Sequence, residues 1–225
     1  NVDFKMNNLN QEIIKFDYEQ NFTDDDFYIS KSNKHIFELI NSWPKWEKNF
    51  LNIFGEKFSG KTHLINIFLK NFKGIKLDAS KLNNENLIEI KIHQNIILEN
   101  LNKNINEKLF FTLLNIVDQD NKYLIVTSID PMVKINFDLN DLKSRSKNFL
   151  AYNIEKPDDE LMFALILKNL SDRQIALDKK LINYIVKRID RSYSKIFDFI
   201  YKVDEISLKK KKSIDFKIIK EALGE

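Results

Sequence analysis

Short runs of consecutive apolar residues alternate, over the first two thirds of the chain, with stretches in which apolar residues recur every three or four positions. The stretches with helical spacing predict helices that contain residues 36–40, 64–69 and 107–117. The continuous runs predict five β-strands, which cover residues 50–54, 74–79, 95–100, 123–128 and 148–154. Because strands that alternate with helices form parallel sheets, we expect an α/β fold with helices on both faces of the sheet.

After Pro157 the apolar spacing becomes purely helical. Pro157 suits the first turn of one helix, and Asp178 suits the N-cap of a second. Two further helices are predicted, one beginning at Tyr193 and one over residues 215–223. The expected organisation is an arm over residues 1–24, an α/β domain over residues 25–155 and a helical domain over residues 156–225.

Composition narrows the class of protein. Hydrophobic residues make up 43% of the 225 residues and charged residues 31%, which is typical of soluble globular proteins. No apolar run approaches the ~20 residues of a membrane span, the N-terminus has no apolar signal segment, and cysteine is absent. We therefore expect a cytoplasmic protein without disulfides or membrane contact. The net charge of +3 permits contact with nucleic acid but does not require it.

The strongest chemical signal is the pattern G-x-x-x-x-G-K-[ST] from Gly55 to Thr62, between the first predicted strand and a helix. Glycines let successive backbone N–H groups point at a phosphate chain, and the helix adds its N-terminal partial positive charge. Lys61 would neutralise phosphate charge, and the Thr62 hydroxyl would ligate Mg²⁺. The alternative is an ordinary glycine turn, but two of only four glycines stand at this spacing. The residues expected to contact a nucleotide here are Gly55, Glu56, Lys57, Phe58, Ser59, Gly60, Lys61, Thr62 and His63.

A short apolar patch led by a glutamine interrupts the polar arm, with Gln11, Ile14 and Phe16 at its centre. Such a patch either packs locally on the domain or docks in the groove of a partner protein. The spacing alone leaves both interpretations open.

Taken together, these motifs resemble the DnaA-type family of AAA+ ATPases, the bacterial replication initiators. Residues 55–64 are similar to the family motif G-x-x-G-x-G-K-T-H-L, with Phe58 where the middle glycine usually lies. Residues 27–33 resemble the family segment F-x-x-G-x-S-N, so the resemblance implies that Phe27 and Tyr28 contact the base. It also implies a P-loop AAA+ parallel-sheet domain with a C-terminal α-helical lid domain, over most of residues 22–225.

We expect the protein to lack the initiators' C-terminal helix-turn-helix domain, and such a short form resembles the Hda-type homologues. In that branch a Q-x-x-L-x-[LF] peptide binds the DNA polymerase sliding clamp, and Gln11, Ile14 and Phe16 fall at its positions. The resemblance implies that the clamp-bound protein carries ADP or ATP, with ADP favoured, and promotes ATP hydrolysis by the initiator DnaA.

The chain departs from the family pattern where the acidic pair should follow the third strand, because Glu99 and Asn100 stand there. Glutamate can still reach the shell of a Mg²⁺ ion held by Thr62, but asparagine cannot accept a proton, so we expect weak or absent hydrolysis by this chain. Thr127 or Ser128 falls at the sensor 1 position, or is a simple strand-end hydroxyl. Lys195 aligns with the sensor 2 arginine and keeps its charge without the bidentate fork.

Residues 142–145 resemble the L-x-S-R box, in which Arg145 would be an arginine finger acting on a neighbouring subunit's nucleotide. The alternative for Arg145 is a surface arginine in a weak ion pair. Two other functions stay open, namely a DnaA-related scaffold that recruits partners to DNA without stimulating hydrolysis, and an autonomous ATPase. Direct DNA contact and a homodimer are also left open by the sequence.

Overall fold

The computed structural model describes residues 27–173, 175 and 177–225. The predicted docking peptide at Gln11, Ile14 and Phe16 lies outside these residues. Five parallel strands form one sheet in the order β2-β3-β4-β1-β5, which confirms the predicted α/β fold. The strands are β1 (Phe50–Phe54), β2 (Ile75–Asp78), β3 (Asn95–Leu101), β4 (Tyr123–Ser128) and β5 (Leu150–Asn153).

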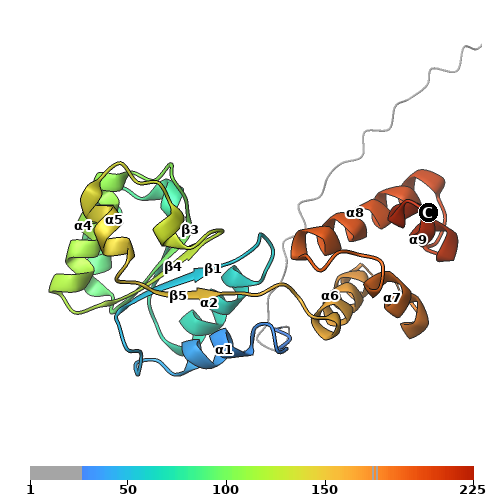
Figure 1. Cartoon of the computed structure of the whole chain (residues 1–225), viewed down its shortest axis with the longest axis horizontal. Helices are drawn as coiled ribbons and strands as arrows, with labels where there is room; N and C mark the ends of the chain where they lie inside the picture. The colour runs from blue at the N-terminus through green and yellow to red at the C-terminus, as the bar shows by residue number, and fades with distance from the viewer. Residues whose placement is uncertain (1–26, 174, 176) are drawn as a thin grey trace, which may run out of the picture.

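Helices cover both faces of the sheet (Figure 1). On one face pack α1 (Lys34–Asn41) and α2 (Lys61–Asn71), and on the other α3 (Asn84–Glu89), α4 (Glu107–Gln119) and α5 (Asn140–Ser146). Successive side chains of β3 point to opposite faces of the sheet. Ile96 and Leu98 pack in the cluster on the α4 side, while Ile97 packs in the cluster on the α2 side. The central strands are therefore apolar on both faces, as the continuous runs predict.

The last four helices form a bundle beside the carboxyl end of the sheet (Figure 1). They are α6 (Asp159–Asp172), α7 (Lys179–Val186), α8 (Tyr193–Lys210) and α9 (Phe216–Leu223). Their apolar faces make a separate hydrophobic cluster that includes Met162, Ile182, Ile196 and Ile219. Within the described part of the chain, no helix combines the length and the apolar character needed to cross a bilayer.

Three local expectations need correction. Pro157 lies before the helix rather than in its first turn, because the Asp158 side chain accepts the Leu161 N–H at 2.8 Å and so caps α6. Short α3 and α5 were absent from the expected elements because six and seven residues give too little periodicity to detect. Strand β5 is four residues long rather than seven, since pairing with β1 ends at Asn153.

Asn52 is fully buried in central strand β1 and ties this strand to the loop after β4. Its amide donates to the Ser128 hydroxyl at 2.9 Å, and its carbonyl oxygen accepts the Met132 N–H at 2.8 Å. We expect Asn52→Leu to lower the free energy of unfolding by about 2–3 kcal/mol, because it leaves a buried N–H without an acceptor. Urea denaturation would measure this loss. The control Asn49→Leu removes a surface bond to Asn121 and should change stability by less than about 0.5 kcal/mol.

Candidate functional site: a P-loop cavity

The loop from Gly55 to Gly60 connects the carboxyl end of β1 to the first residue of α2, Lys61. Gly60 has φ +90°, a left-handed conformation that favours glycine, and it places the following N–H groups at the start of the helix. At Gly55 a Cβ atom would lie 3.0 Å from the Ile154 carbonyl oxygen, with φ +154°. Both glycines of the motif are therefore required by backbone geometry, as the pattern predicts.

Lys61 lies with its ammonium group inside the loop. Its Nζ donates to the carbonyl oxygens of Gly55 and Glu56 at 2.7 and 2.8 Å and to the Ser59 hydroxyl at 3.3 Å. Burial lowers the pKa of Lys61 to about 8, although the negative charges of Glu56 and Glu99 oppose that shift. The cation is thus positioned by the loop and is only partly solvated.

A cavity of about 840 Å³ opens beside this loop, between the carboxyl ends of the strands and the helical bundle. Its size and its position at strand ends fit a nucleotide. The structure brings ten of the predicted nucleotide-contacting residues to its wall, which are Phe27, Tyr28, Lys57, Phe58, Ser59, Gly60, Lys61, Thr62, His63 and Ser128. Phe27 makes an edge contact with the His63 ring, with centroids 5.2 Å apart. The segment before α1 and the P-loop therefore share one site.

Five predicted site residues do not line this cavity. Gly55 and Thr127 are buried, Glu56 is half-buried, and Lys195 is exposed on α8. Glu99 is 7% exposed, with one carboxylate oxygen 3.7 Å from the Lys76 ammonium and the other buried without a hydrogen-bond partner. Thr62 thus faces the cavity, while Glu99 lies close enough for its charge to act on Lys61. No group of three or more His, Cys, Asp or Glu suited to a metal occurs among the described residues.

The strand ends hold their polar side chains in internal hydrogen bonds. Asn100 lines the cavity with φ +61°, and its amide donates to Asp78 at 2.7 Å. Its N–H donates to the Thr127 hydroxyl at 3.1 Å, and the Ser128 hydroxyl donates to the Asp130 carbonyl oxygen at 2.6 Å. Hydrogen bonds from Ser80, and next from Asn100, lower the pKa of Asp78. The side chain at this edge of the cavity is therefore the Asn100 amide, which is hydrogen-bonded to the Asp78 carboxylate.

Residues from the bundle complete the wall, and sequence reasoning missed them. They are Leu161, Leu165, Lys168, Asn169 and Asp172 of α6, Arg173 at its C-cap, and Tyr193 and Phe197 of α8. Arg173 donates to the Asn169 carbonyl oxygen at 2.9 Å and lies 3.5 Å from Asp204. Polar residues on an amphipathic helix carry no local signal that they will face a cavity, so only the position of the bundle reveals them.

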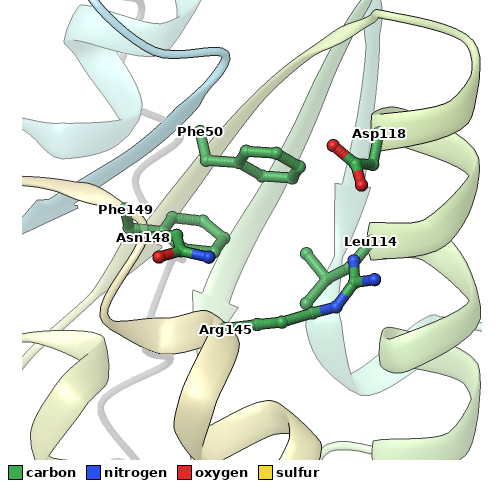
Figure 2. Close-up of a pocket in the computed structure, with 6 residues that line it drawn as sticks. All are labelled: Phe50, Leu114, Asp118, Arg145, Asn148 and Phe149. Carbon is green, nitrogen blue, oxygen red and sulfur yellow. The ribbon is translucent and has the colours of Figure 1, made fainter.

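Arg145 lies elsewhere, half-buried near the end of α5 (Figure 2). Its guanidinium group is 5.2 Å from the centre of the Phe111 ring, and it lines a pocket of about 160 Å³ with Phe50, Phe149 and Asp118. Phe50 begins β1 and Phe149 precedes β5, so this pocket is at the amino edge of the parallel sheet. The P-loop follows the other end of β1, roughly 13 Å away at 3.3 Å per residue. Arg145 is therefore separated from the chain's own cavity by the sheet.

Comparisons with known proteins agree with this architecture. No protein-family model matches the chain. The chromosomal replication initiator DnaA of Borreliella afzelii (strain PKo) is 26% identical over 76% of this chain and 41% of its own length. DnaA of Thermoanaerobacter sp. (strain X514) is 25% identical over 97% of this chain and 55% of its own length. The chain thus spans about half the length of the curated relatives it matches.

Solved structures show the same fold. Domain III of the Thermotoga maritima replication initiation protein DnaA has a TM-score of 0.70 at 19% identity, covering 91% of this chain and 96% of that chain. A replication initiator DnaA bound to AMPPCP and single-stranded DNA has a TM-score of 0.65 at 19% identity, with coverages of 84% and 68%.

The parallel sheet, the P-loop and the adjoining helical bundle give this chain the AAA+ fold that DnaA domain III also has. Its sequence is similar to those of the DnaA-type replication initiators, at 25–26% identity over three quarters or more of the chain.

Proposed function

We propose that this chain is a cytoplasmic, Hda-like regulator of replication initiation. It binds an adenine nucleotide, associates with the sliding clamp and stimulates ATP hydrolysis by the initiator DnaA. The observation that carries the proposal is that the nucleotide cavity and the candidate arginine finger lie at opposite edges of the sheet in this chain. The P-loop and its cavity lie at one edge of the sheet, while Arg145 lies at the other. An arginine in that place is too far from the chain's own cavity to contact its nucleotide, so in this proposal it acts on the nucleotide of another subunit.

The nucleotide half of the proposal is supported by the chemistry of the cavity wall. Backbone N–H groups at the start of α2 and the Lys61 ammonium would hold the phosphates, while Phe27 and Tyr28 would contact the base. Thr62 and Glu99 are the residues that would hold Mg²⁺, which neutralises phosphate charge when bound. Asn100 at the strand end cannot take a proton from water, so the chain would keep its nucleotide with little turnover. DnaA relatives bound to AMPPCP are consistent with this use of the site.

The clamp half of the proposal is carried by the resemblance of Gln11, Ile14 and Phe16 to the docking peptide, which lies outside the described residues. The deciding experiment measures ATP hydrolysis by DnaA with clamp loaded on DNA, with and without this chain. We expect stimulation that is lost when Gln11→Ala abolishes clamp binding. Clamp binding without stimulation would instead favour a recruiting scaffold. Rapid hydrolysis by this chain alone would establish an autonomous ATPase.

The pKa of Lys61 predicts a pH dependence of nucleotide affinity. An anion binds better to the protonated lysine, so affinity should be constant below pH 7 and fall as pH rises through 8. Because bound phosphate raises the pKa in the complex, the dissociation constant for ADP should increase about tenfold between pH 7 and pH 9. Fluorescence anisotropy with a labelled ADP would measure it. Lys61→Arg keeps its charge throughout this range and should give a flat profile, whatever its absolute affinity.

A further inference from the structure

Two P-loop side chains reach away from the loop's phosphate-facing backbone and contact α8 of the bundle. The Glu56 carboxylate accepts hydrogen bonds from the Ser192 hydroxyl, from the Tyr193 N–H at 3.1 Å and from the Ser194 N–H at 3.2 Å. One turn further along α8, the Phe197 ring packs on the Phe58 ring with centroids 4.7 Å apart. The loop that would hold phosphate is therefore in direct contact with the beginning of α8.

Glu56 completes the N-terminus of α8 as a capping residue does. The first N–H groups of a helix have no partner within it, and the positive end of the helix dipole favours a carboxylate. The hydroxyl of Ser192, the N-cap residue, accepts the Lys195 N–H, and the Glu56 carboxylate accepts the Tyr193 and Ser194 N–H groups. Burial alone would raise the pKa of Glu56, but the hydrogen bonds from Ser192, Ser194 and Tyr193 outweigh it and lower the pKa. The cap is thus made by the ionised carboxylate.

Phe58 makes a second contact with α8, and its backbone has a strained conformation. Its φ of +66° is a left-handed conformation that residues other than glycine rarely adopt. Glycine would reach this conformation without strain but would lose the ring contact with Phe197. The loop conformation and the position of α8 therefore depend on each other.

We propose that Glu56 and Phe58 are positioning residues that hold α8 against the P-loop, so that phosphate binding and closure of the bundle are one coupled equilibrium. Tyr193 and Phe197 line the cavity, so any movement of α8 away from Glu56 opens one wall of it. The nucleotide part of this coupling rests on the proposed function, whereas the contact between loop and helix does not.

The first arm of the test follows the helix alone, by amide hydrogen exchange of the full chain. Glu56→Gln removes one of the two acceptor oxygens and the negative charge at the helix N-terminus. We therefore expect the Tyr193 and Ser194 amides to exchange about tenfold faster, which corresponds to about 1.4 kcal/mol. The matched control is Asp215→Ala, which removes an acidic cap from α9 by freeing the Ile218 N–H. The control should speed exchange in α9 and leave α8 unchanged. Equal exchange of the α8 amides in Glu56→Gln and the natural chain would overturn the proposal.

The second arm measures release of fluorescent ADP by stopped flow. Glu56→Gln and Phe58→Gly should each release it about tenfold faster, while Asp215→Ala should release it at the natural rate. Faster exchange in α8 with unchanged release would show that the cap is only structural and would reject the coupling. A natural chain that binds no nucleotide would reject both the proposed function and the coupling. In that case the exchange arm would still decide whether Glu56 caps α8.

Discussion

Arg145→Ala is expected to return ATP hydrolysis by DnaA to its unstimulated rate, while nucleotide binding by this chain stays unchanged. The guanidinium group lies at the amino edge of the sheet, against the Phe111 ring and far from the chain's own P-loop. An arginine supplied in trans accounts for about 10³–10⁵ in rate in other NTPases, so its loss should remove nearly all stimulation. Phosphate release from DnaA·ATP with clamp loaded on DNA gives the measurement.

Two comparisons make the Arg145 result specific. Arg145→Lys keeps the charge but loses the bidentate fork, so it should recover only a small part of the stimulation. Arg188→Ala removes a surface arginine of the bundle that pairs with Glu225, and it should stimulate as the natural chain does. Full stimulation by Arg145→Ala would show that another group acts on the partner's nucleotide. If two copies of this chain associate in the same way, Arg145 of one copy would face the cavity of the other. Any ATP hydrolysis in that cavity would then also depend on Arg145.

Lys61→Ala should weaken ADP binding by about 100-fold or more. Each hydrogen bond to a charged group contributes about 1.5–3 kcal/mol, and 1.4 kcal/mol is a factor of ten in the dissociation constant. Lys61 is the cation that the loop itself holds in place, through two carbonyl oxygens and the Ser59 hydroxyl. Isothermal titration calorimetry would measure the change in affinity.

The matched control for Lys61 is Lys70→Ala, which removes a lysine from the last turn of the same helix, α2. It should bind ADP with natural affinity, because that end of α2 points away from the cavity wall. Natural ADP affinity in Lys61→Ala would contradict the assignment of the P-loop as the phosphate site. The cavity would then need another ligand.

Much of the fold could be predicted because burial on both faces leaves an unmistakable pattern. The apolar run Tyr123–Val126, followed by Thr127 and Ser128, predicts a strand over residues 123–128, and β4 covers the same six residues. Short elements were harder, since α3 relies on a capping box between Asn83 and Asn86 rather than on periodicity. Asparagine is common throughout this chain, so its capping role there could not be told from its presence elsewhere.

The candidate site could be predicted only where its residues lie close together in sequence. The P-loop is one continuous segment, and its strand–loop–helix context is readable from spacing. The wall that α6 contributes depends on how the bundle meets the sheet, which no spacing encodes. Glu56 illustrates the limit, because its motif position suggests phosphate contact while its side chain caps α8, 136 residues or more away in sequence. Which side chain faces which element is decided by packing between distant segments.

The strand order has a consequence for biosynthesis. Strand β1 pairs with β4 and β5 and with no strand that lies nearer to it in sequence among those described. Its first ladder therefore cannot form until residue 124 has left the ribosome, and the second needs residue 150. Leu51 and Ile53 are fully buried in the folded chain but have no partner strand until then, so we expect the nascent chain to cover them by transient collapse or by binding a chaperone.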